Sequence, residues 1–199
     1  MYLVGEFAPG KSILWHAGAS SVSISGIQLA KGDGAKAVYV TASSQEKIDF
    51  CKSLGATEGF NYKTQDWSQE ILKATDGKGV DIIVDFVGGT YFQGNINCAA
   101  RDARVVLLGN MGGTKLPEGV DIGALLFKRI RYEGSTLRSR DEDYQGKLRN
   151  TLAEHALPKF KDGSYKVVVE KILPWEKIQE AHELMESNQT KGKIIMTIS

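Results

Sequence analysis

The residues best placed to do chemistry form a turn of small side chains near the start of the chain. An apolar run at 12–15 predicts a short buried strand, and apolar residues at helical spacing beyond position 21 predict a helix. Between them, no side chain in 17–21 is larger than a hydroxymethyl group. A strand that enters a helix through such a turn directs backbone N–H groups and the positive end of the helix dipole at one point, where a phosphate can bind. An ordinary strand-to-helix turn has the same pattern, so the turn alone leaves both interpretations open.

Composition and charge narrow the class of protein. The 199 residues are 42% hydrophobic, which supports a substantial core, and no apolar run reaches membrane-spanning length. With 25 basic and 24 acidic residues, the net charge is +1, so no nucleic-acid or membrane partner is indicated. Cys51 and Cys98 are far apart and lack metal-ligand spacing. We therefore expect a reducing, cytoplasmic location and no structural disulfide.

The elements that must position the turn alternate regularly. The sequence predicts strands at 12–15, 37–41, 58–62, 80–85, 104–108 and 130–133, and between them helices that include 45–53, 67–75, 91–100 and 122–128. This alternation predicts an α/β fold with a doubly wound, parallel, six-stranded sheet of the Rossmann type. Ligands of such sheets bind at the carboxyl ends of the strands, here 17–22, 41–47, 62, 85–89 and 109–111.

The rhythm changes towards the C-terminus. We expect one long helix at 141–160, with Leu148, Leu152, His155 and Ala156 on one face. A strand at 167–172, a helix at 175–187 and a strand at 193–198 would follow. The sequence therefore predicts a dinucleotide-binding domain at 1–160 and a C-terminal β–α–β segment at 161–199.

Ten stretches in consistent order carry a resemblance to a known family. They are 16–22, 28–31, 41–47, 54–56, 59–63, 85–89, 112–113, 137–141, 178–182 and 192–194. Together they resemble NADPH-dependent quinone oxidoreductases of the zinc-free branch of the medium-chain dehydrogenase/reductase superfamily. The likeness is strongest to the tumour-suppressor-inducible group, and it covers the chain from about residue 4 to 198.

The resemblance implies NADP(H) as cofactor and a quinone or related unsaturated carbonyl (an enal) as the small-molecule hydride acceptor. In this family a β-rich, GroES-like catalytic domain comes first, and the C-terminal segment completes it. We expect that domain to be absent here and the chain alone to have little or no turnover. Two alternatives stay open: an enoyl or alkenal reductase with the same cofactor half, and a non-catalytic nucleotide-sensing module.

The resemblance also suggests how the cofactor would be bound. The family has glycines where this chain has Ser21 and Ser23, so the Ser21 hydroxyl either donates to a phosphate oxygen or crowds the phosphate out. No carboxylate follows the second strand to hold a ribose 2′-hydroxyl. By resemblance, Ser44, Lys47 and Tyr62 would instead select a 2′-phosphate. A solvated lysine and a packed strand-end tyrosine are the plainer alternative.

The expected cofactor contacts extend along the whole edge of the sheet. Positions 86–88 would line the adenosine side, 108–111 the nicotinamide ribose, and 136–137 the nicotinamide ring. The full set is Ala17, Gly18, Ala19, Ser20, Ser21, Val22, Thr41, Ser43, Ser44, Lys47, Tyr62, Phe86, Val87, Gly88, Leu108, Asn110, Met111, Thr136 and Leu137.

No catalytic residue is assigned from the sequence. His16, His155 and His182 have no serine or cysteine placed for a triad, so each is interpreted as a core or surface histidine. No cluster has the composition of a zinc site, and we expect no metal. Arg138 and Arg140 are interpreted as helix-entry charges and not as substrate ligands.

The last predicted strand of the sheet is expected to lie at an edge. In this superfamily that strand, Ile130 to Glu133, commonly pairs with its copy in a second subunit. Because an exposed edge is a ready template for pairing, we expect a homodimer.

Overall fold

The strands of the main sheet are all parallel in the computed structural model. The structure describes residues 1–198, so Ser199, the last residue of the predicted segment 161–199, lies outside the described residues. The strands are β1 (Ser12–Trp15), β2 (Ala37–Ala42), β3 (Glu58–Asn61), β4 (Val80–Asp85), β5 (Ala99–Leu107) and β6 (Arg131–Gly134). Their order is β3-β2-β1-β4-β5-β6, which confirms the doubly wound, six-stranded sheet. The order reverses between β1 and β4, so this gap is the switch point.

Successive residues of a strand point to opposite sides of the sheet, so the apolar strands expose apolar side chains on both faces. Helices cover both of these faces. They are α1 (Ser21–Gly32), α2 (Gln45–Ser53), α3 (Trp67–Ala74), the 3₁₀ turn η1 (Gly89–Tyr91), α4 (Phe92–Cys98) and α5 (Gly123–Phe127). On one face, Ile13 and Trp15 pack with Ile27 of α1. On the other, Leu14 packs with Ile71 of α3. Strands buried on both faces are typical of parallel sheets.

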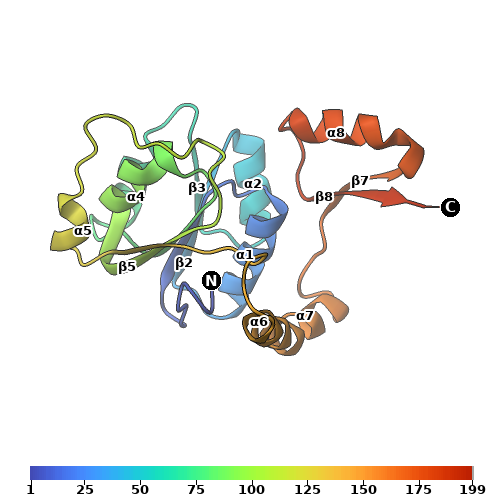
Figure 1. Ribbon diagram of the computed structural model, residues 1–199, viewed down its shortest axis with the longest axis horizontal. Coiled ribbons are helices and arrows are strands. Elements are labelled where there is room, and N and C mark those ends of the chain that lie inside the picture. The colour runs from blue at the N-terminus through green and yellow to red at the C-terminus, as the bar shows by residue number, and fades with distance from the viewer. Residues whose placement is uncertain (199) are drawn as a thin grey trace.

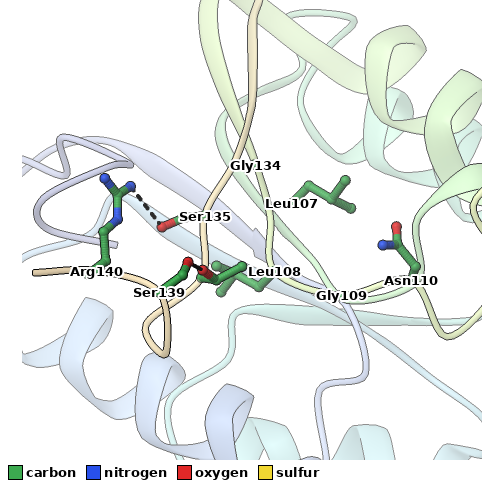
Figure 2. A pocket seen from close by; sticks show the side chains of 9 residues that line it. Leu107, Leu108, Gly109, Asn110, Gly134, Ser135, Ser139 and Arg140 are labelled. Atoms are coloured by element: carbon green, nitrogen blue, oxygen red, sulfur yellow. Dashed lines mark hydrogen bonds between the residues drawn. The ribbon is translucent and has the colours of Figure 1, made fainter.

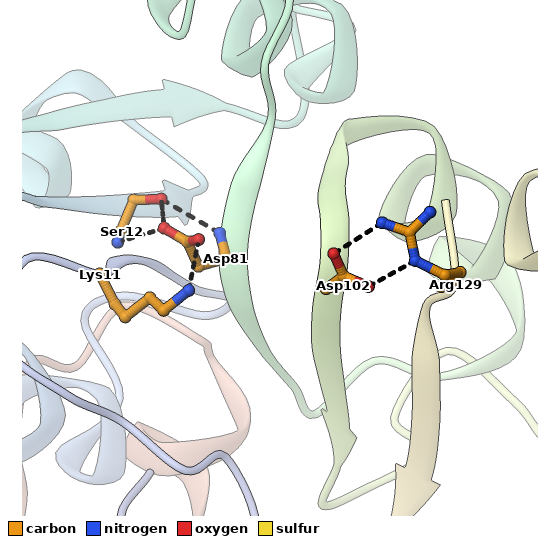
Figure 3. Close-up of polar contacts among 5 residues, drawn as sticks. All are labelled: Lys11, Ser12, Asp81, Asp102 and Arg129. Carbon is orange, nitrogen blue, oxygen red and sulfur yellow. Dashed lines mark hydrogen bonds and ion pairs between the residues drawn. The ribbon is translucent and has the colours of Figure 1, made fainter. Parts of the chain in front are cut away.

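The amino-terminal edge of the sheet is fixed by polar contacts, away from the expected ligand edge. The Asp81 carboxylate accepts from Ser12 N and Ser12 Oγ, both at 2.8 Å, and from Lys11 Nζ at 3.1 Å (Figure 3). Burial opposes the charge, but these hydrogen bonds lower the pKa of Asp81. Further along the same edge, Arg129 forms a two-pronged ion pair with Asp102.

The fifth strand begins earlier than predicted, and the helix before it is shorter. The predicted helix 91–100 ends at Cys98, and β5 starts at Ala99 instead of 104. The reason is tertiary: Lys128 Nζ donates to the carbonyl oxygens of Ile96, Asn97 and Ala99 at 3.2, 2.6 and 3.0 Å and caps the helix from outside. The strand then bulges, because Val80 pairs with Ala99 but Ile82 pairs with Arg104.

The predicted long helix at 141–160 is two helices. They are α6 (Glu142–His155) and α7 (Leu157–Lys161), with the break at Ala156. Pro158 has no N–H to continue the hydrogen-bond ladder of α6, and it lies in the first turn of α7, where that N–H is not needed, which explains the break. Of the four residues predicted on one face, Ala156 is buried and His155 is exposed.

The C-terminal segment forms a separate β–α–β unit, as predicted. We call residues 162–198 the tail; it contains β7 (Val169–Pro174), the 3₁₀ turn η2 (Trp175–Lys177), α8 (Ile178–Glu186) and β8 (Lys193–Thr197). β7 starts two residues later than the predicted strand at 167, and it pairs with β8 in a parallel two-stranded sheet. Figure 1 shows this unit beside α1 and α2.

Candidate nucleotide site

The turn of small residues lies at the switch point, between β1 and α1. Gly18 donates its N–H to the Thr41 carbonyl at 2.8 Å, and a Cβ at position 18 would lie 2.8 Å from the Val40 Cβ. Only glycine fits this approach to β2. Within residues 1–198, the backbone N–H groups of Ser21 and Val22 have no hydrogen-bond partner. Together with the positive end of α1, these groups are free to bind an anion.

The two serines of this turn are engaged by the protein itself. Ser23 is fully buried, and its Oγ donates to the His16 carbonyl at 2.8 Å, so strand and helix pack closely around it. Ser21 Oγ donates to the Gly192 carbonyl of the tail at 2.8 Å, while Gly192 N donates to the Ala19 carbonyl at 3.3 Å. The sequence did not anticipate this third role for the Ser21 hydroxyl, a contact that holds the tail beside the turn.

Cations gather where β2 ends. Ser44 is the N-cap of α2 and accepts the N–H of Lys47 at 3.3 Å. Lys47 Nζ donates to the Asn188 carbonyl of the tail at 2.5 Å. Burial lowers the pKa of Lys47, and the positive charges of Lys63 and Lys191 lower it further. Because Lys191 Nζ pairs with the Glu46 carboxylate at 2.7 Å, the attraction for an anionic ligand at the end of β2 comes chiefly from Lys47 and Lys63.

Three other residues expected at this end of the sheet, Tyr62, Ser43 and Thr41, differ in how deeply they are buried. Tyr62, just after β3, has 41% of its surface exposed, and Ser43 is half-buried. Thr41 is fully buried, and its hydroxyl bonds to the His16 ring at 2.9 Å. The Thr41 side chain therefore belongs to the core, and its contact with a cofactor stays a prediction.

The loops after β4 and β5 are joined to each other. Met111 N donates to the Phe86 carbonyl at 3.0 Å, and Gly112 N donates to the Val87 carbonyl at 2.7 Å. Gly88 has a φ of +83°, and a Cβ there would lie 2.7 Å from Asn110 Oδ1. The expected residues on these two loops are thus brought together over the middle of the sheet.

A cavity of about 440 Å³ opens between the carboxyl ends of β5 and β6 (Figure 2). It is lined by Leu107, Leu108, Gly109, Asn110, Gly134, Ser135, Thr136, Ser139 and Arg140. Three predicted residues, Leu108, Asn110 and Thr136, are among them, whereas Leu137 is exposed and is not. Arg140 lines the cavity too, although it was interpreted as a helix-entry charge. Its position in the loop that follows the last strand was the signal for this role.

Beneath the site, a buried hydrogen-bond chain links four strand ends. Asp85 Oδ2 accepts from Asn95 Nδ2 at 2.9 Å and from the Tyr132 hydroxyl at 3.3 Å, and Asp85 Oδ1 accepts from two loop N–H groups. A carboxylate only accepts, so Asn95 Oδ1 must accept from His16 Nε2 (2.7 Å), and His16 Nδ1 must accept from the Thr41 hydroxyl. This order assigns one neutral tautomer to His16, and burial lowers its pKa.

Within residues 1–198, neither cysteine is placed as a nucleophile and no metal site is formed. Cys51 and Cys98 are buried, and burial raises the pKa of both thiols to about 12. His155 and His182 are exposed, as predicted for surface histidines. Among residues 1–198, no three or more His, Cys, Asp or Glu side chains are grouped so that they could hold a metal ion. No helix in that range is long and apolar enough to cross a membrane.

The chain is similar in sequence and fold to known dehydrogenases and reductases. Residues 21–154 match the family model described as zinc-binding dehydrogenase. A solved NAD-dependent alcohol dehydrogenase is 32% identical, with a TM-score of 0.81 over 98% of this chain and 53% of that one. Quinone oxidoreductase from Escherichia coli, solved with NADPH, is 27% identical, with a TM-score of 0.81 over 97% of this chain and 59% of that one.

A third relative is 2-haloacrylate reductase from Burkholderia, 27% identical over 192 residues, which are 94% of this chain and 56% of that protein. The chain spans about half the length of the dehydrogenase and reductase relatives that it matches.

Proposed function

The chain belongs to the zinc-binding dehydrogenase family of the medium-chain dehydrogenase/reductase superfamily, and on this premise we propose that it is the NADP(H)-binding portion of a quinone oxidoreductase. The main support for this proposal is that the backbone N–H groups of Ser21 and Val22 have no hydrogen-bond partner within residues 1–198. They lie at the start of α1 and at the switch point of the sheet. They suit the adenosine-side phosphate of a dinucleotide. When bound, the nicotinamide would supply the hydride, and this chain's residues would hold and orient the cofactor.

In this proposal the 2′-phosphate lies at the end of β2. The lysine ammonium groups supply positive charge there, and no carboxylate of β2 or of the Ser43–Ser44 loop competes for the ribose. Lys47 would exchange its carbonyl partner, Asn188, for a phosphate oxygen, which is a stronger, charge-assisted partner. Tyr62 stands exposed beside it. NADPH is therefore the proposed cofactor in preference to NADH.

Residues 1–160 would form the cofactor domain, and 161–199 would contribute to a catalytic domain. The tail supports this division, since Ile172 and Trp175 expose 62% and 55% of their surfaces. Such apolar surface fits burial against further protein. We assign no catalytic residue, we place the protein in the zinc-free branch and the cytoplasm, and we expect this chain alone to turn over little substrate.

The test is a calorimetric titration of the chain with NADPH and with NADH. Lys47→Gln should weaken NADPH binding about tenfold, because one charge-assisted hydrogen bond is lost, and should leave NADH binding within about twofold. Lys52→Gln, on the same helix but exposed, is the matched control and should change neither. Equal weakening of both cofactors, or binding of neither by the unaltered chain, would contradict the proposal.

A second candidate function is reduction of a carbon–carbon double bond conjugated to a carbonyl group, as in an enoyl or alkenal reductase. The similarity to 2-haloacrylate reductase favours it. The two candidates share the same cofactor half. They are separated by comparing the turnover of a quinone with that of an enal, measured on a full-length protein that contains this chain.

We also propose a homodimer through β6. This strand ends the sheet, and in α5, which precedes it in the chain, Leu126 and Phe127 expose 75% and 74% of their surfaces. An open strand edge and exposed apolar side chains both favour pairing with a second copy. Light scattering should give the mass of a dimer, which Phe127→Asp would convert to that of a monomer.

A further inference from the structure

The cavity between β5 and β6 has an uneven distribution of charge. On the β5 side it is lined by leucine, glycine and asparagine, and on the β6 side by hydroxyl groups and one arginine. Of the nine described residues that line it, Arg140 alone is ionisable. One end of the cavity is therefore positive, and its volume of about 440 Å³ is within the range of small-molecule sites.

The backbone around Arg140 is held in place from two sides. Arg140 N donates to the Leu137 carbonyl at 3.2 Å, and the Arg140 carbonyl accepts from Gln145 Nε2 at 2.8 Å. The guanidinium stacks on the Tyr144 ring, with Cζ 4.4 Å from the ring centroid, and Nη2 reaches Ser135 Oγ at 3.3 Å. Figure 2 shows this side chain directed towards Ser135. These contacts orient the guanidinium before any ligand arrives.

The positive charge of Arg140 is not neutralised within residues 1–198, where it forms no ion pair. The adjacent carboxylate, Asp141, is the N-cap of α6 and accepts the N–H of Tyr144 at 2.7 Å. Four of the five guanidinium N–H groups have no hydrogen-bond partner within residues 1–198, and the Ser135 hydroxyl, which accepts from Arg140, keeps its own proton to donate. A planar oxyanion matches such donors.

We propose that the Arg140–Ser135 end of this cavity is an oxyanion subsite, which binds a carboxylate or a phosphate group. The proposal rests on the proposed function, since the nicotinamide half of the cofactor is expected at 108–111 and 136–137, at the ends of β5 and β6. The oxyanion then has two sources. One is the phosphate on the nicotinamide side of the dinucleotide, and the other is the carboxylate of an unsaturated acid substrate.

The test measures binding of small probes by ligand-observed NMR titration of the intact chain. Reduced nicotinamide mononucleotide carries the phosphate and reduced nicotinamide riboside, which is uncharged, lacks it; acrylate carries a carboxylate and acrylamide lacks it. In the unaltered chain at least one anionic probe should bind about tenfold more tightly than its neutral counterpart. Arg140→Gln should remove that preference and Arg140→Lys should keep part of it. Arg138→Gln, a neighbouring arginine outside the cavity, should change it less than about twofold.

The pattern of losses identifies the source. Loss of the mononucleotide preference alone assigns the subsite to the cofactor phosphate, and loss of the acrylate preference alone assigns it to a substrate carboxylate. No preference for either anion, or a preference that survives Arg140→Gln, overturns the inference. Binding of adenosine 2′,5′-bisphosphate tests the proposed cofactor site separately, because that probe belongs to the β2 end, remote from Arg140. Its failure would count against the proposed function and not against the oxyanion subsite.

Discussion

The molecule contains two parallel sheets that differ sharply in how they are buried. All four residues of β1 are buried, and so are five of the six in β4. In the tail, only Leu173 of the six β7 residues is buried, and no residue of β8 is. Parallel strands are normally covered on both faces, so the first sheet is a complete core and the second is not.

The difference shows that the tail is held by a few specific contacts and not by a core of its own. Gln28 exchanges two hydrogen bonds with the backbone of Lys166, at 2.7 and 3.1 Å, and Ser21 bonds to Gly192. These contacts join the tail to α1 and to the turn that begins it. A change in the main sheet should therefore affect the whole chain, whereas a change at the tail should act locally.

The largest expected effect comes from removing a core side chain. Ile83 in β4 is fully buried, and Ile83→Ala should lower the free energy of unfolding by about 3–4 kcal/mol through lost burial and the cavity left behind. Ile172→Ala is the matched change in β7. Because 62% of the surface of Ile172 is already exposed, this change should cost less than about 1 kcal/mol. Urea denaturation measures both, and similar losses at the two sites would contradict the comparison.

The next effect comes from the buried polar chain under the site. Asn95→Leu leaves the His16 ring nitrogen and the Asp85 carboxylate without their partner, which should cost about 2–3 kcal/mol. Asn97→Leu, on the same helix, removes only a bond from Gln93 and should cost about 0.5 kcal/mol or less. If both variants unfold at the same urea concentration, the buried chain has no special role.

A pH titration should separate the core histidine from the tail histidine. Because burial lowers the pKa of His16, the unfolded chain binds a proton near pH 6.5 before the folded chain does. Stability is then fully present above that pH and falls as the pH drops, by at most about 1.4 kcal/mol per pH unit. Unfolding measured from pH 7 to pH 5 should lose this slope in His16→Gln and keep it in His182→Gln. A slope unchanged in both variants would refute the assignment.

The smallest effect concerns the attachment of the tail. Ser21→Ala removes the hydrogen bond to the Gly192 carbonyl, which should cost about 1 kcal/mol and speed local opening about fivefold. Hydrogen exchange of residues 188–196 measures this opening. Ser25→Ala, whose hydroxyl bonds only within α1, should leave that exchange unchanged. Faster exchange in both variants would mean that Ser21 is not a specific anchor.

Much of the fold follows from local sequence. The strand at 12–15, the helix at 45–53 and the strand at 80–85 match their predictions residue for residue, because apolar runs, caps and turn residues agree there. The boundary between α4 and β5 does not, since Lys128, 30 residues beyond Cys98 in sequence, decides where that helix ends. A cap supplied from a distant element leaves no local signal.

The site divides in the same way. The sheet, its carboxyl edge and the turn at 17–21 could be predicted, because periodicity and small side chains act locally. The contact of Thr41 with His16, the attachment of the tail to Ser21 and the place of Arg140 in a cavity could not. Each of these depends on which side chain from another element comes within hydrogen-bonding or packing distance. Folding brings residues 21 and 192 together, and no spacing along the chain records that contact.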